Sequence, residues 1–255
     1  MLRWVIAGQL ARGPRPGYMG EGADPVSQDA VNKWLFQARE LGIRSIICLL
    51  ADDQLKLYSS LGTDLISYYR EKGFEVAHVP APDHLQPPLT ESQLDDVWQA
   101  YQQLPKPVLV HCSAGIDRTG RAIEHITGKL ESRMFELINA ASTIIHARYR
   151  HGFHHVGAAL RSKSGKIFSA VHLEASVGRI AVCAEAIALG MAAAEGDSDV
   201  EMIVAVSKGG EVMPLCGMCR ELVSDYAPDA LVIVPGPTTP MIVPVARLLP
   251  YKYQG

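Results

Sequence analysis

Residues 110–121 read Val-His-Cys-Ser-Ala-Gly-Ile-Asp-Arg-Thr-Gly-Arg, which places Arg118 six residues after Cys112. An apolar run precedes the segment and a helix-compatible stretch follows it, so its free N–H groups and the helix dipole should favour an anion. The same field favours the thiolate of Cys112, which is the nucleophilic form. Arg118 can hold two phosphate oxygens with its planar guanidinium. The segment therefore predicts a phosphate-binding loop with a cysteine nucleophile; the alternative is a buried cysteine in an ordinary strand-to-helix turn.

A second group of cysteines lies later in the chain. Cys183 begins a Cys-Ala-Glu triplet, and Cys216 and Cys219 stand in a Cys-Gly-Met-Cys segment. Three thiolates at two predicted helix starts suit tetrahedral zinc with its fourth position open for water, whose pKa the metal lowers. Glu185, two residues after Cys183, can then transfer protons without binding the metal. The alternatives are merely buried cysteines or a closed structural zinc site, for which His172 is the candidate fourth ligand.

The first segment, with its glycines and flanking His111, resembles the cysteine-dependent tyrosine and dual-specificity phosphatase superfamily. The resemblance covers roughly residues 1–130 and implies a phosphocysteine intermediate at Cys112. It also implies that the hydroxyl of Thr119 helps the thiolate leave. The expected phosphate-binding residues are Ser113, Ala114, Gly115, Ile116, Asp117, Arg118 and Thr119.

A phosphatase of this kind needs a general acid to protonate the leaving oxygen. In similar families the acid comes from an upstream loop, and Asp83 stands on a Pro-rich loop 29 residues before Cys112. The alternatives are Asp117, because some lipid-phosphatase relatives carry an Asp there, and a merely solvated carboxylate at Asp83. His111 is expected to support the loop by hydrogen bonds rather than to transfer protons.

The second half, almost from Met134 to Tyr253, resembles the small cytidine deaminase family. The resemblance rests on Cys-Ala-Glu at 183–185, Cys-Gly-x-Cys-Arg at 216–220, an apolar strand at 156–160 and Leu-Leu-Pro at 248–250. It implies a mixed sheet in a three-layer α/β/α fold, one zinc ion per chain and Glu185 as the proton shuttle. The Cys-Ala-Glu form is similar to the nucleoside-acting branch, which implies a homo-oligomer, either a tetramer or a dimer. The expected zinc ligands are Cys183, Cys216 and Cys219.

The residues expected to read the substrate depart from that family's pattern. The ribose-binding Asn-x-Glu pair appears as His172-Leu173-Glu174, and His154 stands at the aromatic base-stacking position. We therefore expect Glu174, His172 and His154 to line the nucleoside site. The substrate could be cytidine, or a modified cytosine nucleoside as in blasticidin-type deaminases. The neighbouring histidines at 151 and 155 are interpreted as loop residues rather than as a second metal site.

Alternating strands and helices predict an α/β protein whose first half is a mainly parallel sheet with flanking helices. Strands are expected at residues 4–7, 43–50 and 74–79 and in the segment that carries His111, and helices at 28–41, 63–73, 90–104 and 135–146. Ser27 and Thr63 are expected to cap the first two helices, and Thr90 with Gln93 to form a capping box for the third. The junction is expected at residues 128–133. The predicted domains are therefore a phosphatase-like domain at 1–130 and a deaminase-like domain at 131–255.

Composition limits the class of protein. The chain has 255 residues, a net charge of −3 and 48% hydrophobic residues, which indicates globular protein and gives no support to a general nucleic-acid or membrane-surface binder. A local basic group keeps a nucleic-acid partner open as an alternative, and it comprises Arg148, Arg150, Arg161, Lys163 and Lys166. Four of the five cysteines stand in motifs that need free thiolate, and no signal peptide is visible, so a cytoplasmic location is expected.

Together these patterns predict a bifunctional hydrolase. One site would be a thiolate phosphatase for a phosphoester, with a nucleotide as one candidate, and needs no cofactor. The other would be a zinc-dependent hydrolytic deaminase of cytidine or a related cytosine nucleoside. The covalent fusion suggests that both act on one pathway. The alternatives are a signalling protein or lipid phosphatase with a zinc-stabilised nucleoside-binding or oligomerisation module, and a deaminase regulated by a phosphate-binding domain.

Overall fold

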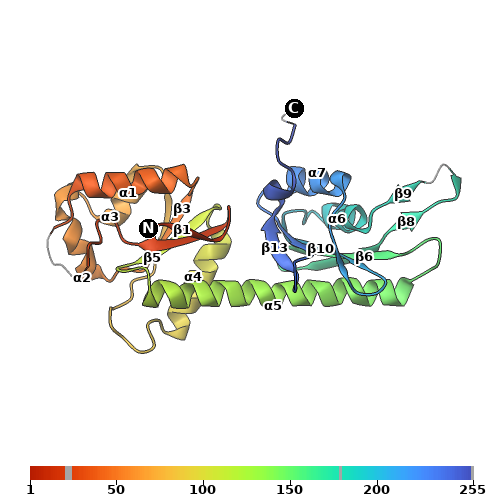
Figure 1. Ribbon diagram of the computed structural model, residues 1–255, viewed down its shortest axis with the longest axis horizontal. Helices are drawn as coiled ribbons and strands as arrows, with labels where there is room; N and C mark the ends of the chain where they lie inside the picture. The colour runs from red at the N-terminus through yellow and green to blue at the C-terminus, as the bar shows by residue number, and fades with distance from the viewer. Residues whose placement is uncertain (21–24, 178–179, 254–255) are drawn as a thin grey trace. The chain divides into compact units, whose positions relative to one another are not determined.

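The computed structural model describes residues 1–20, 25–177 and 180–253. The chain divides into two compact units, Met1–Lys129 and Leu130–Gly255 (Figure 1). The domain bounds expected from the sequence, 1–130 and 131–255, stay a prediction. Within the described residues, no helix combines the length and apolar character needed to cross a membrane.

The first unit is built on a five-stranded sheet. Its spatial order is β1 (Arg3–Ile6), β2 (Leu10–Pro14), β5 (Val108–Cys112), β3 (Ser45–Cys48) and β4 (Glu75–His78). Only β1 is antiparallel to its neighbour, so the predicted mainly parallel sheet is confirmed. Strand β2 was not predicted, because its Gly13 and Pro14 are typical of a loop. A Cβ at Gly13 would lie 2.3 Å from Leu2 Cδ2, so a larger residue there would require the Leu2 side chain to move.

Helices cover both faces of this sheet. They are α1 (Gln28–Glu40), α2 (Asp52–Leu55), the 3-10 helix η1 (Lys56–Leu61), α3 (Leu65–Glu71), α4 (Glu91–Gln103) and the start of α5 (Asp117–Arg148). Ser27 caps α1 and the pair Thr90 and Gln93 forms the capping box of α4, as predicted. The cap of α3 is Asp64 rather than Thr63, since the Asp64 carboxylate accepts from Ser67 N at 2.9 Å. Helices α1 and α3 pack on one face through a shared core that includes Val31, Trp34, Leu35, Ile46, Leu65 and Tyr69.

Helix α5 runs without interruption through the expected junction at 128–133. The helix predicted at 135–146 is confirmed as part of α5, but its continuity with the helix that begins at Asp117 was not predicted. Buried residues recur every three or four positions along α5, at Ile126, Leu130, Met134, Leu137, Ala141 and Ile145. This stripe continues the helix through Gly128, because one interior glycine costs only about 1 kcal/mol relative to alanine.

The second unit contains a mixed sheet. Its strands lie in the order β13 (Met241–Pro244), β12 (Leu231–Val234), β10 (Val200–Ser207), β6 (Val156–Ser162) and β7 (Ile167–Val171), with β11 (Val212–Met213) paired to β10. Only β10 and β12 are parallel. A separate hairpin joins β8 (Leu173–Glu174) to β9 (Ala181–Val182), and the 3-10 helix η3 (Val245–Leu248) follows β13.

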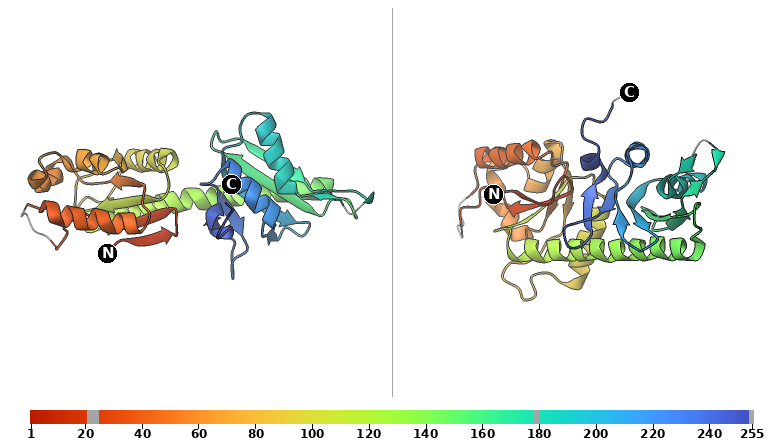
Figure 2. Two further views of the ribbon diagram at one scale, coloured as in Figure 1. Left: turned by 90° about the horizontal axis from the view of Figure 1, so that it is seen from above. Right: turned by 45° about the vertical axis from the view of Figure 1, so that its right-hand side comes forward.

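Helices lie on both faces of the mixed sheet (Figure 2). Helices α6 (Ala184–Ala194) and α7 (Gly217–Tyr226) bury Ala188, Leu189 and Val223 in one core with the sheet. The C-terminal part of α5 packs against β6, where a Cβ on Gly157 would lie 2.5 Å from Ala141 O. This arrangement is the expected α/β/α sandwich.

Candidate functional sites

The predicted phosphate-binding loop connects the end of β5 to the start of α5. The backbone N–H groups of residues 114–118 have no hydrogen-bond partner among the described residues. Gly115 has a φ of +72°, and a Cβ there would lie 2.4 Å from the carbonyl of Gly13. Arg12 donates to Gly115 O at 2.7 Å and fixes the loop from β2. The loop therefore presents unpaired donors at a helix N-terminus, as an anion site requires.

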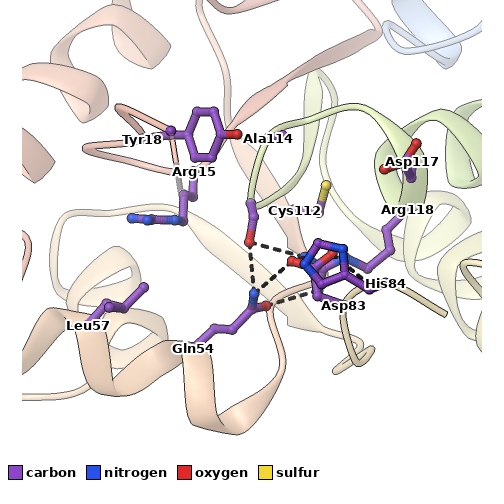
Figure 3. Close-up of a pocket in the computed structure, with 12 residues that line it drawn as sticks. Arg15, Tyr18, Gln54, Leu57, Asp83, His84, Cys112, Ala114, Asp117 and Arg118 are labelled. Carbon is purple, nitrogen blue, oxygen red and sulfur yellow. Dashed lines mark hydrogen bonds and ion pairs between the residues drawn. The ribbon is translucent and has the colours of Figure 1, made fainter. Parts of the chain in front are cut away.

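Arg118 lies under this loop and is 2% exposed. Its Nη2 donates to Asp83 Oδ2 at 2.5 Å and to Ser113 Oγ at 3.1 Å (Figure 3). Its Nη1 donates to Gln54 Oε1 at 2.9 Å and to Ala81 O at 2.7 Å. The structure thus brings the predicted general acid and the predicted phosphate-binding arginine into direct contact.

Gln54, from α2, joins the residues of this site and was not found from the sequence. Its Nε2 donates to Asp83 Oδ2 and to Ser113 Oγ, both at 2.9 Å. Its Oε1 accepts from Arg118 and from Ala51 N. The side chain therefore holds acid, loop and arginine in one network. No motif marks it, because Gln54 lies 58 residues before Cys112 in an unpatterned segment.

Asp83 is ionised in this arrangement. Burial of its side chain opposes ionisation, but hydrogen bonding from Gln54 and the charge of Arg118 together lower the pKa of the Asp83 carboxyl. The next residue, His84, has a left-handed backbone with a φ of +58°, a conformation that is uncommon outside glycine and often found at functional sites. Asp117, the competing acid, is exposed and lines the same cavity.

His111 and Thr119 flank the cysteine in the buried interior. The Nδ1 of His111 lies 3.3 Å from Cys112 O, and its Nε2 lies 3.2 Å from the hydroxyl of Tyr69. Burial lowers the pKa of His111 to about 4, so the ring is neutral at pH 7 and suits support rather than proton transfer. The Thr119 hydroxyl is buried and has no hydrogen-bond partner among the described residues, which leaves it free for a group at Cys112. Cys48 is fully buried, as expected of a core residue.

A cavity of about 480 Å³ opens beside Cys112. Cys112, Asp83 and Arg118 line it together with Arg15 and Tyr18, which the sequence analysis did not single out. Both follow β2, the strand missed from the sequence, so nothing in the pattern placed them beside Cys112. The volume lies in the range that encloses a whole small molecule.

In the second unit, the three predicted zinc ligands converge. The thiol sulfurs of Cys183, Cys216 and Cys219 all lie within 4.8 Å of one another, and Cys183 Sγ lies 3.4 Å from Cys216 Sγ. Tetrahedral zinc with Zn–S bonds of about 2.3 Å would separate its sulfurs by about 3.8 Å, so the donor set fits this metal. Cys183 and Cys216 are the N-caps of α6 and α7, where the helix dipoles favour thiolates. Among the described residues, no other group of three potential ligands clusters in this way.

Glu185 and His172 line a second cavity, of about 170 Å³, beside the cysteines. Glu185 is 5% exposed, and burial raises the pKa of its carboxyl. The Nδ1 of His172 accepts from the backbone N–H groups of His155 and Val156, at 2.9 and 3.1 Å. His172 is therefore held by backbone contacts, and its Nε2 lies 3.4 Å from Glu174 Oε1.

The other residues expected to read the substrate lie around His172. His154 Nδ1 is 2.7 Å from His172 O, and its ring lies 6.3 Å from that of His172. Of the three expected residues, only His172 is among the described residues that line the cavity. The nucleoside-binding roles of Glu174, His172 and His154 stay a prediction.

The basic group noted in the sequence is largely neutralised. Arg161 pairs with Glu136, Lys163 with Asp199 and Lys166 with Glu195, at 3.0 to 3.1 Å. Arg150 lies over the ring of Phe153. That nucleic acid is not a partner of this group stays a prediction.

Two protein families match the two halves of the chain. Residues 21–128 match the family described as "Polymorphic toxin system, DSP-PTPase phosphatase". Residues 132–234 match the family described as "Cytidine and deoxycytidylate deaminase zinc-binding region". The class of protein is therefore a phosphatase-like domain joined to a zinc-binding deaminase domain.

Individual relatives agree with this division. The chain is 43% identical over 135 residues to a blasticidin-S deaminase from Bacillus cereus. The matched segment covers 50% of this chain and 96% of the relative. Through its second half, the chain belongs to the cytidine and blasticidin-S deaminase family.

Solved structures similar to each half are also known. A cytidine deaminase from Mycobacterium leprae is 24% identical with a TM-score of 0.41, covering 46% of this chain and 97% of its own. The core catalytic domain of a PP-IP phosphatase from S. cerevisiae, solved with citrate, is 19% identical with a TM-score of 0.31, covering 58% of this chain and 73% of its own.

Proposed function

We propose that the protein is a bifunctional hydrolase that deaminates a cytosine nucleoside of the cytidine or blasticidin S type and dephosphorylates a small phosphoester. One observation carries the deaminase assignment: the three cysteine thiols cluster, and two of them, Cys183 and Cys216, line one cavity with the buried carboxyl of Glu185. The 43% identity to a blasticidin-S deaminase favours a modified cytosine nucleoside over cytidine itself.

In the deaminase site, Cys183, Cys216 and Cys219 would hold zinc. When bound, zinc supplies the activation of water for attack on the amine-bearing ring carbon. Glu185 then takes up a proton and delivers it to the amine, which leaves as ammonia. Its burial beside the triad suits this role, because burial raises the pKa of the Glu185 carboxyl and so makes it a better proton acceptor. His172, fixed by two backbone donors, would orient the nucleoside.

We further propose that a second copy of the chain completes this cavity. Its 170 Å³ is smaller than the range that encloses a whole small ligand. Exposed apolar side chains lie on the β8–β9 hairpin and at the start of α7, namely Leu173, Val182 and Met218. Such a surface favours a homo-oligomer. Light scattering on the whole chain and on Met218→Lys tests this: a monomeric wild type would overturn it.

In the phosphatase site, the Cys112 thiolate would attack phosphorus, forming an S–P bond as the P–O ester bond breaks. The phosphoryl oxygens would take over the donors of Arg118 and the loop N–H groups, and so displace Asp83 from Arg118. Without that partner, and beside a phosphate, the Asp83 carboxyl would gain a proton and give it to the leaving oxygen. Water would then hydrolyse the S–P bond and release phosphate, while Thr119 donates to the departing thiolate.

The deaminase proposal is tested with Glu185→Gln in the full chain. We expect ultraviolet-monitored deamination of blasticidin S and cytidine to fall by at least about a hundredfold, with zinc content unchanged. Glu195→Gln, at the exposed C-terminal end of α6, is the matched control and should keep turnover. If wild type binds zinc and nucleoside but turns over neither substrate, the module only binds and the enzymatic proposal fails.

The phosphatase proposal is tested with Cys112→Ser. We expect hydrolysis of p-nitrophenyl phosphate to be lost while calorimetric binding of inorganic phosphate remains. Cytidine 5′-monophosphate then tests a shared pathway, since loss of both phosphate and amine from it would link the two sites. If aryl phosphate is turned over but no nucleotide is, the shared pathway fails and the phosphatase stands.

A further inference from the structure

Arg15 is a second arginine fixed beside the phosphate-binding loop. It follows Pro14, which pairs with Cys112 in the parallel register of β2 and β5. Its backbone N–H donates to Ser113 O at 2.9 Å, so its position relative to the loop is set by the backbone. The residue is 6% exposed, which is unusual for an arginine without a function.

Among the residues that the structure describes, the contacts of Arg15 compensate its charge poorly. Among the described residues, no carboxylate forms an ion pair with its guanidinium, and its hydrogen bond to Pro16 O is long, at 3.4 Å. Its remaining neighbours are the ring of Tyr18, at 5.6 Å, and the hydroxyl of Tyr58. Arg118, in contrast, has an Asp83 carboxylate and four further acceptors. A buried guanidinium without an anion costs several kcal/mol, which binding of an anion would offset.

The position of Arg15 in the cavity indicates where that anion would lie. In the view of Figure 3, Arg15 and Arg118 lie on opposite sides of Cys112, and Tyr18 and Leu57 flank Arg15. Both arginines line the same cavity of about 480 Å³. A single phosphate bound in the loop would use Arg118 and leave the Arg15 side of the cavity to the rest of the substrate.

We propose that Arg15 forms a second anion subsite, which binds a second phosphate group of the substrate. The phosphatase half then acts on small molecules that carry two phosphate groups, either as a bisphosphate or as a diphosphate. This inference rests on the proposed phosphatase function of Cys112. The phosphate bound in the loop is the one transferred to Cys112. Binding of the other phosphate by Arg15 sets the substrate specificity.

The test compares ligands that differ by one phosphate, measured by calorimetry on the full chain with Cys112→Ser to prevent turnover. The probes are inorganic phosphate, inorganic diphosphate, propyl phosphate and propane-1,3-diyl bisphosphate. We expect at least one two-phosphate probe to bind on the order of 10- to 100-fold more tightly than its one-phosphate counterpart. Adding Arg15→Gln should remove this advantage and change the affinity for inorganic phosphate by less than about threefold. No advantage in the parent, or an equal loss for all probes, overturns the subsite.

Three further variants separate the subsite from a structural role. Arg12→Gln removes the donor that holds Gly115 O and should weaken all probes alike. Arg3→Gln removes one exposed positive charge and should change no affinity. Arg15→Lys keeps the charge but loses the planar fork, so it should retain part of the advantage even if Arg15→Gln does not fold.

Turnover of p-nitrophenyl phosphate by the wild-type chain reports the proposed function separately. Absence of turnover of p-nitrophenyl phosphate and of both two-phosphate probes, together with an Arg15-dependent advantage in binding, would overturn the phosphatase and leave the anion subsite. Turnover without the binding advantage would overturn the anion subsite and leave the phosphatase.

Discussion

His111 should make the stability of the first unit depend on pH. The folded pKa of about 4 lies below the ordinary value of 6.5, because the ring is buried and the charges of Arg118 and Arg15 add to the effect. Between these two values the unfolded chain binds a proton that the folded chain excludes. The neutral His111 ring therefore makes its full contribution to the free energy of unfolding above pH 6.5, and this contribution is lost as the pH falls from 6.5 toward 4.

The magnitude follows from these two pKa values. One proton of difference changes the free energy of unfolding by about 1.4 kcal/mol per pH unit, so His111 alone should remove about 2 kcal/mol between pH 7 and pH 5. That is a large share of the stability of a small domain. A protonated Nε2 would have to donate to the Tyr69 hydroxyl oxygen, 3.2 Å away, so this hydroxyl could no longer donate to the ring.

Tryptophan fluorescence gives an assay that reports this unit alone. The chain has three tryptophans, Trp4, Trp34 and Trp98, and all lie before residue 130. Trp34 lies 5.3 Å from the His111 ring, between centroids. Urea unfolding of the full chain at several pH values from 5 to 7 would give the slope directly.

The matched comparison is His111→Gln, which removes the titration, against His125→Gln. The pKa of His125 is also lowered by partial burial, but this ring is less buried, so its loss should change the slope less. We expect His111→Gln to lower the free energy of unfolding at pH 7. It should also reduce the slope of that free energy against pH by the equivalent of about one bound proton. An unchanged slope in His111→Gln would refute the argument, because the buried neutral ring would then not be its source.

Three other predictions concern the loop, the acid and the metal. Gly115→Ala should lower the free energy of unfolding of the first unit by about 2–4 kcal/mol in urea, because the backbone is left-handed and the new Cβ would contact Gly13. The control is Gly73→Ala, where the backbone is also left-handed but the space is open, and it should cost only about 1–2 kcal/mol. Equal costs would contradict the argument from the Gly13 contact. Asp83→Asn should tighten inorganic phosphate binding about threefold to tenfold, because a competing charge leaves Arg118, and should slow hydrolysis of an alkyl phosphate about 10²- to 10⁴-fold; unchanged binding would show that the ion pair does not compete. Removing zinc with a chelator should speed amide hydrogen exchange at the N-termini of α6 and α7, and adding zinc back should restore protection. The tryptophan-monitored unfolding of the first unit should not change. Exchange rates that do not respond to the chelator would argue against a metal at the three cysteines.

Local motifs carried much of the prediction. The spacing of Cys112 and Arg118, the capping residues Ser27 and Thr90, and the two cysteine segments each depend on chemistry within a few residues. Such features can be predicted from the sequence because the residues that form a loop, a helix start or a pair of thiolates lie next to one another in the chain. The alternation of strands and helices likewise indicated the α/β class.

Other features depended on contacts between distant segments. Strand β2 forms despite Gly13 and Pro14 because it pairs with β5, about a hundred residues later. Helix α5 passes the expected junction because its buried stripe outweighs one glycine. Local propensity is weak beside such pairing and burial, so the sequence indicated neither strand β2 nor the continuity of α5.

The sequence by itself determined the two reactive groups of this protein: a cysteine and an arginine in one loop, and three cysteines with one glutamate. Only the tertiary structure decided what surrounds them. It placed Asp83 on Arg118, bonded Gln54 to both of them, and brought Arg15 to the same cavity through the register of β2 against β5. Reactive groups follow from residue type and short spacing, whereas the pockets that select a substrate are built from side chains that folding alone brings together.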